Sequence, residues 1–220
     1  MKMFLTLCVF CATLGLVACG QPAQPAASLA PVAAAPTPKP DPKNLQTAVF
    51  AGGCFWSMQR MMDEVPGVIT TTVGYAGGTV PNPTYEQVST ETTGHAESVQ
   101  VVFDSAQISY AKLLDAYWHD INPTEVDQQF CDVGSSYRSI IFYGNAEQQQ
   151  LAETSKQALV KSGRFTDPIV TEIVAAPAFY PAEEYHQDFY KKDPNRYQSY
   201  RLGCGRDRRL KDLWGAVAGH

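Results

Sequence analysis

The sequence predicts an α+β fold, a two-layer sandwich in which helices cover a mixed β-sheet. Strand-like and helix-like segments alternate from residue 47 onward. The strand-like segments are short and often bounded by glycine, whereas the helix-like ones repeat apolar residues at i, i+3 and i+4. The chain has 220 residues, 45% of them hydrophobic, which is enough for one domain with a substantial core.

The first half of the domain predicts three strands and one helix. Residues 47–51 form an apolar run that ends in Gly52-Gly53, which indicates a strand followed by a tight turn. Helical spacing of apolar residues then covers residues 55–65. The β-branched segment 68–75 predicts a second strand, and residues 97–103 predict a third.

The second half adds a clear amphipathic helix, because five apolar residues share one helical face at Tyr110, Leu113, Leu114, Tyr117 and Trp118. The remaining segments predict strands at 138–143 and 169–174, a helix at 146–161 and a short helix at 182–191. The rest is expected to be loop-rich until residues 210–214. This order resembles the ferredoxin-like split βαβ arrangement, with helices on one side of the sheet and a loop-rich C-terminal segment.

Residues 1–19 predict a signal peptide. Lys2 precedes an almost wholly apolar run, and small residues follow it. The end of this run, from Leu16 to Cys19, resembles the bacterial lipoprotein cleavage box, which implies that Cys19 is lipidated. An ordinary cleaved signal with a chance cysteine is the alternative. Gly20 after the cysteine favours the periplasmic face of the outer membrane over the inner membrane.

Residues 20–44 are rich in proline and alanine and predict a disordered tether, which leaves 45–220 as the folded domain. The net charge of -5 argues against a nucleic-acid partner. No second apolar stretch is long enough to span a bilayer, so contact with a membrane is expected through the lipid only.

Three cysteines fall in the domain: Cys54, Cys131 and Cys204. An odd number leaves at least one thiol unpaired. One structural disulfide plus a buried thiol is one interpretation, and pairing that changes during a reaction is the other. Cys54 follows two glycines and begins a predicted helix, where amide groups and the helix dipole can lower the pKa of a thiol.

Glu97 is the second residue that could take part in catalysis. Strand alternation places it on the same face as Val99, Val101 and Phe103, which is the apolar face. A buried carboxyl group has a raised pKa and can act as a general acid. A residue at the strand end that reaches water is the alternative.

Cys54, Glu97 and the histidines of the chain also suggest two other classes of enzyme. His95-Ala96-Glu97 matches half of a zinc deaminase signature, but the second half, two cysteines three positions apart, is missing from the domain. A cysteine hydrolase or acyl transferase would need a histidine to activate Cys54, and His186 is the best candidate. A binding or structural role for the tethered domain would leave Cys54, Glu97 and the glycine turns unexplained.

Six segments together resemble the peptide methionine sulfoxide reductase A family, in the family's order and from residue 47 to residue 215. They are Gly52-Gly53-Cys54-Phe55-Trp56, Gly74-Tyr75-Ala76-Gly77-Gly78, Pro83-Thr84-Tyr85, Thr93-Gly94-His95-Ala96-Glu97, residues 132–139 and Tyr185-His186-Gln187. The resemblance implies thiol-dependent reduction of methionine S-sulfoxide, free or in proteins, and so repair of oxidised proteins under oxidative stress.

The resemblance also implies roles for particular residues. Cys54 is the nucleophile, and Glu97 protonates the sulfoxide oxygen. The hydroxyls that hold this oxygen are implied to be those of Tyr85 and Tyr137. Asp132 matches a carboxylate of the same site. The substrate methyl group would lie against Phe55 and Trp56.

The same resemblance implies how the cycle closes. Cys54 is left as a sulfenic acid, which condenses with a second thiol to a disulfide. Cys204 matches the family's resolving position, and Cys131 is the alternative because it adjoins Asp132. An external dithiol protein of the thioredoxin kind would then reduce the disulfide. No metal and no organic cofactor is implied.

Overall fold

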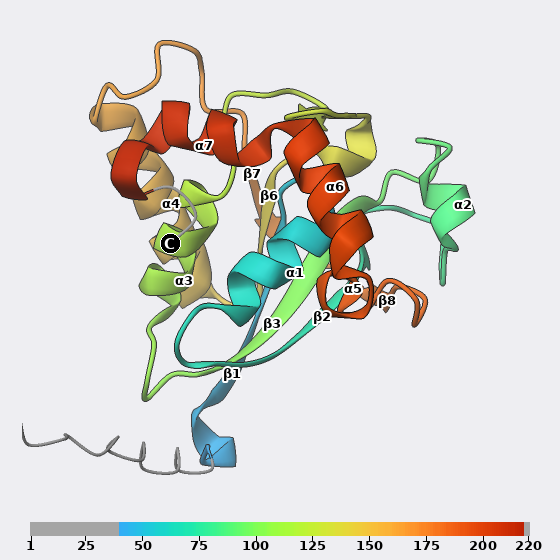
Figure 1. Ribbon diagram of the computed structural model, residues 1–220. Coiled ribbons are helices and arrows are strands. Elements are labelled where there is room, and N and C mark those ends of the chain that lie inside the picture. The colour runs from blue at the N-terminus through green and yellow to red at the C-terminus, as the bar shows by residue number, and fades with distance from the viewer. Residues whose placement is uncertain (1–39, 218–220) are drawn as a thin grey trace, which may run out of the picture. The chain divides into compact units, whose positions relative to one another are not determined.

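The computed structural model describes residues 40–217 of the chain (Figure 1). The predicted signal peptide, Cys19 and all but the last five residues of the predicted tether lie outside the described residues. Within those five, Pro42–Asn44 form a short 3₁₀ helix, η1, that leads directly into the first strand. In residues 40–217 no helix is both long enough and apolar enough to cross a membrane.

A six-stranded sheet in the order β7-β6-β1-β3-β2-β8 forms the centre of the domain. Its strands are β1 Leu45–Ala51, β2 Val68–Ala76, β3 Ala96–Asp104, β6 Ile140–Tyr143, β7 Glu172–Ala175 and β8 Tyr180–Pro181. Strand β3 lies antiparallel between β1 and β2, and β6 pairs parallel with β7. The predicted mixed sheet with a split βαβ unit is confirmed.

The helices are α1 Phe55–Asp63, α2 Tyr85–Val88, α3 Tyr110–His119, α4 Ala146–Lys161, α5 Phe189–Lys192, α6 Pro194–Cys204 and α7 Arg206–Trp214, with 3₁₀ turns η2 Ser135–Tyr137 and η3 Gly215–Val217. Figure 1 shows α1 against strands β2 and β3, with α3 and α4 farther along the sheet. Two very short strands, β4 Gln128–Gln129 and β5 Asp132–Val133, make a separate ribbon.

The main core lies between one face of the sheet and the helices α1 and α3. Phe50, Val99 and Val101 from the sheet pack in one cluster with Met62 of α1 and Leu113 of α3, all of them fully buried. Burying a side chain of this size contributes about 1.5–3 kcal/mol to folding, so this cluster fixes the position of α1. The first residue of α1, which follows β1 after a short turn, is therefore held in a fixed position.

The C-terminal segment differs from its prediction. Residues 182–188 are not helical, and the region expected to be loop-rich contains α6 and α7. Only Tyr197 and Arg201 are buried along α6, so this helix has no apolar stripe to reveal it. Its signals are local ones: the Asp193 side chain accepts the Arg196 N–H, with Pro194 at the first helical position.

Candidate active site

Two glycines place Cys54 at the start of α1. A Cβ atom on Gly52 would lie 2.6 Å from Ile121 Cγ2. Gly53 has φ = 85°, and a Cβ there would lie 2.6 Å from Gln129 Cβ. Only glycine fits at either position, so the chain can turn tightly out of β1. Cys54 is the N-cap of α1, as the sequence predicts, and is only 6% exposed.

Glu97 projects from β3 toward this turn. The strand alternates as predicted, because Val99, Val101 and Phe103 on the same face are fully buried. Glu97 itself is 4% exposed, and its Oε2 accepts the Phe55 N–H at 2.9 Å. Burial raises the pKa of Glu97 to about 8, with a smaller contribution from Asp132, although the Phe55 hydrogen bond opposes the rise. A raised pKa agrees with the expectation of a buried carboxyl group that can carry a proton at neutral pH.

The expectation of a lowered pKa for the Cys54 thiol is wrong for the resting structure. Burial, together with the negative charges of Glu97 and Asp132, raises this pKa to about 12. Glu97 occupies the first free amide group of α1, so the end of the helix acts mainly on the carboxyl group. A hydrogen bond from Trp56 N–H opposes the rise in the Cys54 pKa without cancelling it.

Tyr200 joins Cys54 to Asp132 and was missed by the sequence analysis. Its hydroxyl donates to Asp132 Oδ2 at 2.5 Å, and a second hydrogen bond links it to the Cys54 sulfur. Burial raises the pKa of Asp132, while the Tyr200 hydrogen bond opposes that rise. Tyr200 lies on α6, a helix without an apolar stripe that was expected to be a loop, so the sequence analysis did not place its side chain near Cys54.

Tyr85, at the start of α2, and Tyr137, at the end of η2, lie within electrostatic reach of Glu97. Burial and then the charge of Glu97 raise the pKa of each, and Cys54 and Asp132 contribute to both. Glu183 Oε1 accepts the Tyr85 N–H at 2.8 Å and so anchors the start of α2. The four predicted polar partners of Cys54 therefore lie within electrostatic reach of one another.

Tyr137 stands on η2, which is held by a single carboxylate. Glu91 accepts hydrogen bonds from the Ser136 N–H at 2.8 Å, the Ser136 hydroxyl at 2.7 Å and the Ser135 hydroxyl at 2.8 Å. These bonds lower the pKa of Glu91 despite its partial burial. A charged Glu91 thus fixes the short segment that carries both Asp132 and Tyr137.

An aromatic wall lies beside Cys54. Phe55 is 1% exposed, and its ring centroid lies 6.0 Å from that of Tyr75. Trp56 stacks on Phe189 with ring centroids 3.9 Å apart. The Trp56 indole N–H donates to His186 Nδ1 at 3.1 Å, so His186 supports this wall. Burial lowers the pKa of His186, and none of its hydrogen bonds goes to Cys54.

His95 has a structural task. Its Nδ1 accepts the Gly78 N–H at 3.0 Å, and its Nε2 lies 2.8 Å from Val80 O. With both ring nitrogens occupied, His95 has none left for a metal, which leaves the zinc deaminase interpretation without its histidine ligand.

Cys131 and Cys204 are bonded to each other, with Cα atoms 5.0 Å apart, and Cys54 is a free thiol. The structure therefore contains one disulfide and one buried free thiol. A carboxylate oxygen of Asp132 and both bridge sulfurs lie within 4.8 Å of one another. Since Tyr200 connects that carboxylate to Cys54, the bridge adjoins the free thiol. Cys131, Asp132 and Cys204 also have metal-ligand spacing, but their sulfurs are engaged with each other.

Arg206 is a second residue that the sequence analysis missed. It is 1% exposed, and its Nη2 donates to Asp120 Oδ2 at 2.8 Å, to Asp120 O at 2.6 Å and, more weakly, to Gly52 O at 3.3 Å. Removing one partner of a buried ion pair costs about 3–5 kcal/mol of folding stability, so the Arg206–Asp120 pair holds its two segments together strongly. Arg206 thereby ties the segment that carries Cys204 to the turn that carries Cys54.

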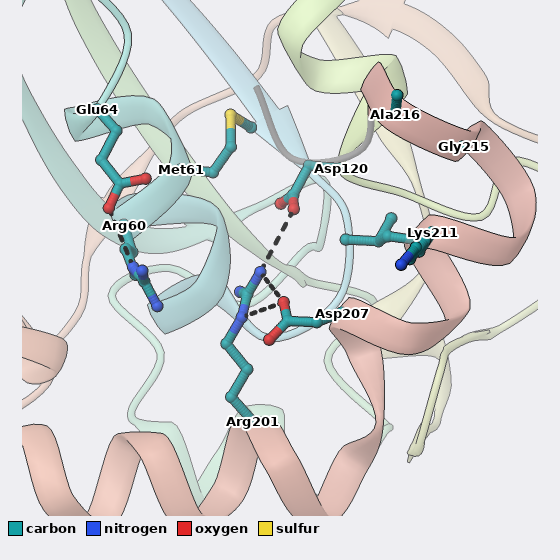
Figure 2. Close-up of a pocket in the computed structure, with 10 residues that line it drawn as sticks. Arg60, Met61, Glu64, Asp120, Arg201, Asp207, Lys211, Gly215 and Ala216 are labelled. Carbon is teal, nitrogen blue, oxygen red and sulfur yellow. Dashed lines mark hydrogen bonds and ion pairs between the residues drawn. The ribbon is translucent and has the colours of Figure 1, made fainter. Parts of the chain in front are cut away.

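A cavity of about 470 Å³ lies between α1, α6 and α7 (Figure 2). Its charged groups are largely matched with one another: Arg201 pairs with Asp207 at 2.6 Å, and Arg60 with Glu64 at 3.1 Å. Neither Cys54 nor Glu97 lines it. This cavity is therefore separate from the buried group around Cys54.

These groups define a thiol enzyme whose cysteine faces a protonated carboxyl group and hydroxyls able to hold an oxygen atom. A family model described as peptide methionine sulfoxide reductase matches residues 46–217. The chain belongs to this family, as the six motifs indicated, and is a thiol-dependent peptide-methionine (S)-S-oxide reductase.

Similar proteins agree. The chain is 54% identical over 170 residues to the peptide methionine sulfoxide reductase MsrA of Bacillus licheniformis, covering 77% of this chain and 94% of that one. The Listeria monocytogenes MsrA is 51% identical over 172 residues, covering 78% and 97%. Among solved structures, methionine sulfoxide reductase A of Corynebacterium diphtheriae aligns with TM-score 0.62 and 34% identity, covering 69% and 76%. Reduced Mxr1 of Saccharomyces cerevisiae aligns with TM-score 0.64 and 31% identity, covering 71% and 90%.

Proposed function

We propose that the chain reduces methionine S-sulfoxide through a sulfenic acid on Cys54. The observation that supports this most is Glu97, a buried carboxyl group with a pKa of about 8 beside the nucleophile. Because the resting thiol is protonated, its proton must leave as the sulfur attacks. Glu97 gives its proton to the sulfoxide oxygen and takes that of Cys54. Cys54–SH and the sulfoxide thus become Cys54–SOH and methionine.

The other residues hold the substrate in this scheme. The hydroxyls of Tyr85 and Tyr137 donate to the oxygen as negative charge develops on it. Phe55 and Trp56 hold the substrate methyl group. Asp132 and Tyr200 keep the attacking sulfur in place. The rival hydrolase is less well supported, because His186 bonds to Trp56 instead of activating Cys54.

The sulfenic acid is then resolved by Cys204. Its thiol attacks Cys54–SOH, which forms a Cys54–Cys204 disulfide and releases water. Cys131 next attacks the Cys204 sulfur, which returns Cys54 as a thiol and leaves the Cys131–Cys204 bridge. The bonded Cys131–Cys204 pair beside a free Cys54 supports this order.

The test is a single turnover by the full chain, reduced and then freed of reductant, with each sulfoxide epimer supplied separately. Methionine should form from the S epimer only, and peptide mapping should then find the Cys131–Cys204 disulfide. The Cys204→Ser variant should still release the first methionine but leave Cys54 as a sulfenic acid that dimedone traps. Methionine from neither epimer contradicts the proposed function, and normal recycling of Cys204→Ser by a dithiol protein contradicts the resolving role.

The electrons for each cycle come from outside the chain, in our proposal from a thioredoxin-like dithiol protein. Two electrons pass by thiol–disulfide exchange, so no prosthetic group takes part. The substrates are proteins or peptides that contain oxidised methionine, and also the free amino acid.

We further propose that the chain is an exported lipoprotein that repairs exported proteins at the periplasmic face of the outer membrane. The apolar run after Lys2 and the box that ends at Cys19 support this. Cys19→Ala should move the protein from the membrane fraction to the soluble fraction of a fractionated cell. Retention in the membrane would show that Cys19 is not the anchor.

A further inference from the structure

The Cys131–Cys204 bridge is asymmetric in its exposure. Cys131 is exposed at the tip of the β4–β5 ribbon, whereas Cys204 is only partly exposed between α6 and α7. A thiolate must approach a disulfide sulfur from outside, opposite the bond that breaks, so access decides which sulfur is attacked. On exposure alone, a protein-sized reductant reaches Cys131 first.

The two sulfurs also differ as leaving groups. Cys204 Sγ accepts the Cys131 backbone N–H at 3.3 Å, a contact that stabilises negative charge on Cys204. Cys131 Sγ lies 3.7 Å from Asp132 Oδ1, and a carboxylate there disfavours negative charge on Cys131. An Asp132 oxygen lies within 4.8 Å of the Cys204 sulfur as well, so the Cys131 N–H contact is the main difference between the two sulfurs. A better-stabilised thiolate leaves faster, so the electrostatics also favour attack on Cys131 with departure of Cys204.

Exposed apolar side chains gather on the two segments that the bridge joins. Within residues 40–217 the three most exposed large hydrophobic side chains are Val133 at 74%, Val126 at 66% and Leu202 at 65%. Val133 ends β5, two residues after Cys131, and Val126 lies two residues before β4, the strand that pairs with β5. Leu202 lies two residues before Cys204. Exposed hydrophobic residues around a reactive group are typical of an interaction site.

We propose that an external dithiol protein docks on Val126, Val133 and Leu202 and enters through Cys131, so that Cys204 is the sulfur released toward the active site. The partner is expected to present apolar and acidic side chains around its thiol, because Arg208 and Arg209 are exposed on the Cys204 side. This inference rests on the proposed function, since the bridge must be the oxidised product of the cycle.

Reduction of the bridge takes two thiol–disulfide exchange steps. A partner thiolate bonds to Cys131 Sγ as the Cys131–Cys204 bond breaks, and Cys204 leaves as a thiolate and takes a proton. The partner's second thiolate then attacks its own sulfur in the mixed disulfide, which releases Cys131. Two electrons have reached the enzyme, and the partner leaves as a disulfide.

The first test traps the mixed disulfide. The full chain with its bridge formed is mixed with a thioredoxin whose second active-site cysteine is replaced by serine, and peptide mass spectrometry locates the new bond. We expect the bond at Cys131. A bond at Cys204, or none at Cys131 while unaltered thioredoxin reduces the bridge, overturns the proposal.

The second test measures docking. Val133→Glu and Leu202→Glu should each raise the KM for thioredoxin about tenfold or more. Val160→Glu is the matched control, because Val160 is 58% exposed on α4, away from both bridged segments, and its KM should stay within about twofold. Equal effects of all three substitutions overturn the docking surface. Single-turnover methionine release involves no partner, so a failure of the proposed function would show there separately.

Discussion

The Cys54→Ser variant is expected to lose sulfoxide reduction by about 10⁴-fold or more, because a serine hydroxyl cannot replace the sulfur that takes the oxygen. The measurement is methionine released in a single turnover from the S epimer. The loss should come from chemistry and not from unfolding, since serine fits the space at the start of α1.

Cys131→Ser is the matched control for that variant. It removes a thiol from the same neighbourhood but leaves Cys54 and Glu97 untouched, so its first turnover should proceed. Turnover retained by Cys54→Ser would refute the role of Cys54 as nucleophile. A first turnover lost in Cys131→Ser as well would point to damage of the whole site.

Glu97→Gln should slow formation of the sulfenic acid by about 10²–10⁴-fold, the usual contribution of a general acid. Glutamine keeps the size of the side chain and can still accept the Phe55 N–H, but it cannot give a proton. Glu64→Gln is the control, because Glu64 follows the same helix and is largely exposed. Rapid-quench measurement of methionine formation gives the rate. An unchanged rate would make Glu97 a structural residue.

The pH dependence gives an independent check. Glu97 acts in its protonated form, and its pKa of about 8 means that this form dominates at pH 7 and is lost as the pH rises through 8. The single-turnover rate of the unaltered enzyme should therefore fall above pH 8. Glu97→Gln should lack this fall, because its amide does not titrate. A fall that persists in Glu97→Gln would belong to another group.

The sequence pattern within a single strand or helix predicted the parts of the site that one such element positions. Strand alternation placed Glu97 on the buried face of β3, and the two glycines placed Cys54 at a helix start. Both follow from the geometry of a single element, so the sequence contains them. The roles assigned by resemblance to Tyr85, Tyr137, Asp132 and the resolving cysteine stay predictions.

Contacts between distant segments could not be predicted in this way. Tyr200 reaches Asp132 across 68 positions, from a helix with no apolar stripe to announce it. Arg206 finds Asp120 inside the core, where arginine is rare. The pKa of Cys54 depends on carboxyl groups from β3 and β5 that converge only in the folded chain. Three cysteines also allow three pairings, and the sequence alone does not choose among them.

The burial of Cys54 limits the reaction of its thiol with oxidants. Peroxides and alkylating agents react with thiolates, and a thiol with a pKa of about 12 is ionised in only about one molecule in 10⁵ at pH 7. The Cys54 thiol is therefore expected to react slowly until a sulfoxide binds beside it. The oxidants that damage its substrates have little chance to drive the same cysteine to the irreversible sulfinic acid. Burial thus keeps the Cys54 thiol protonated and slow to react while no substrate is bound.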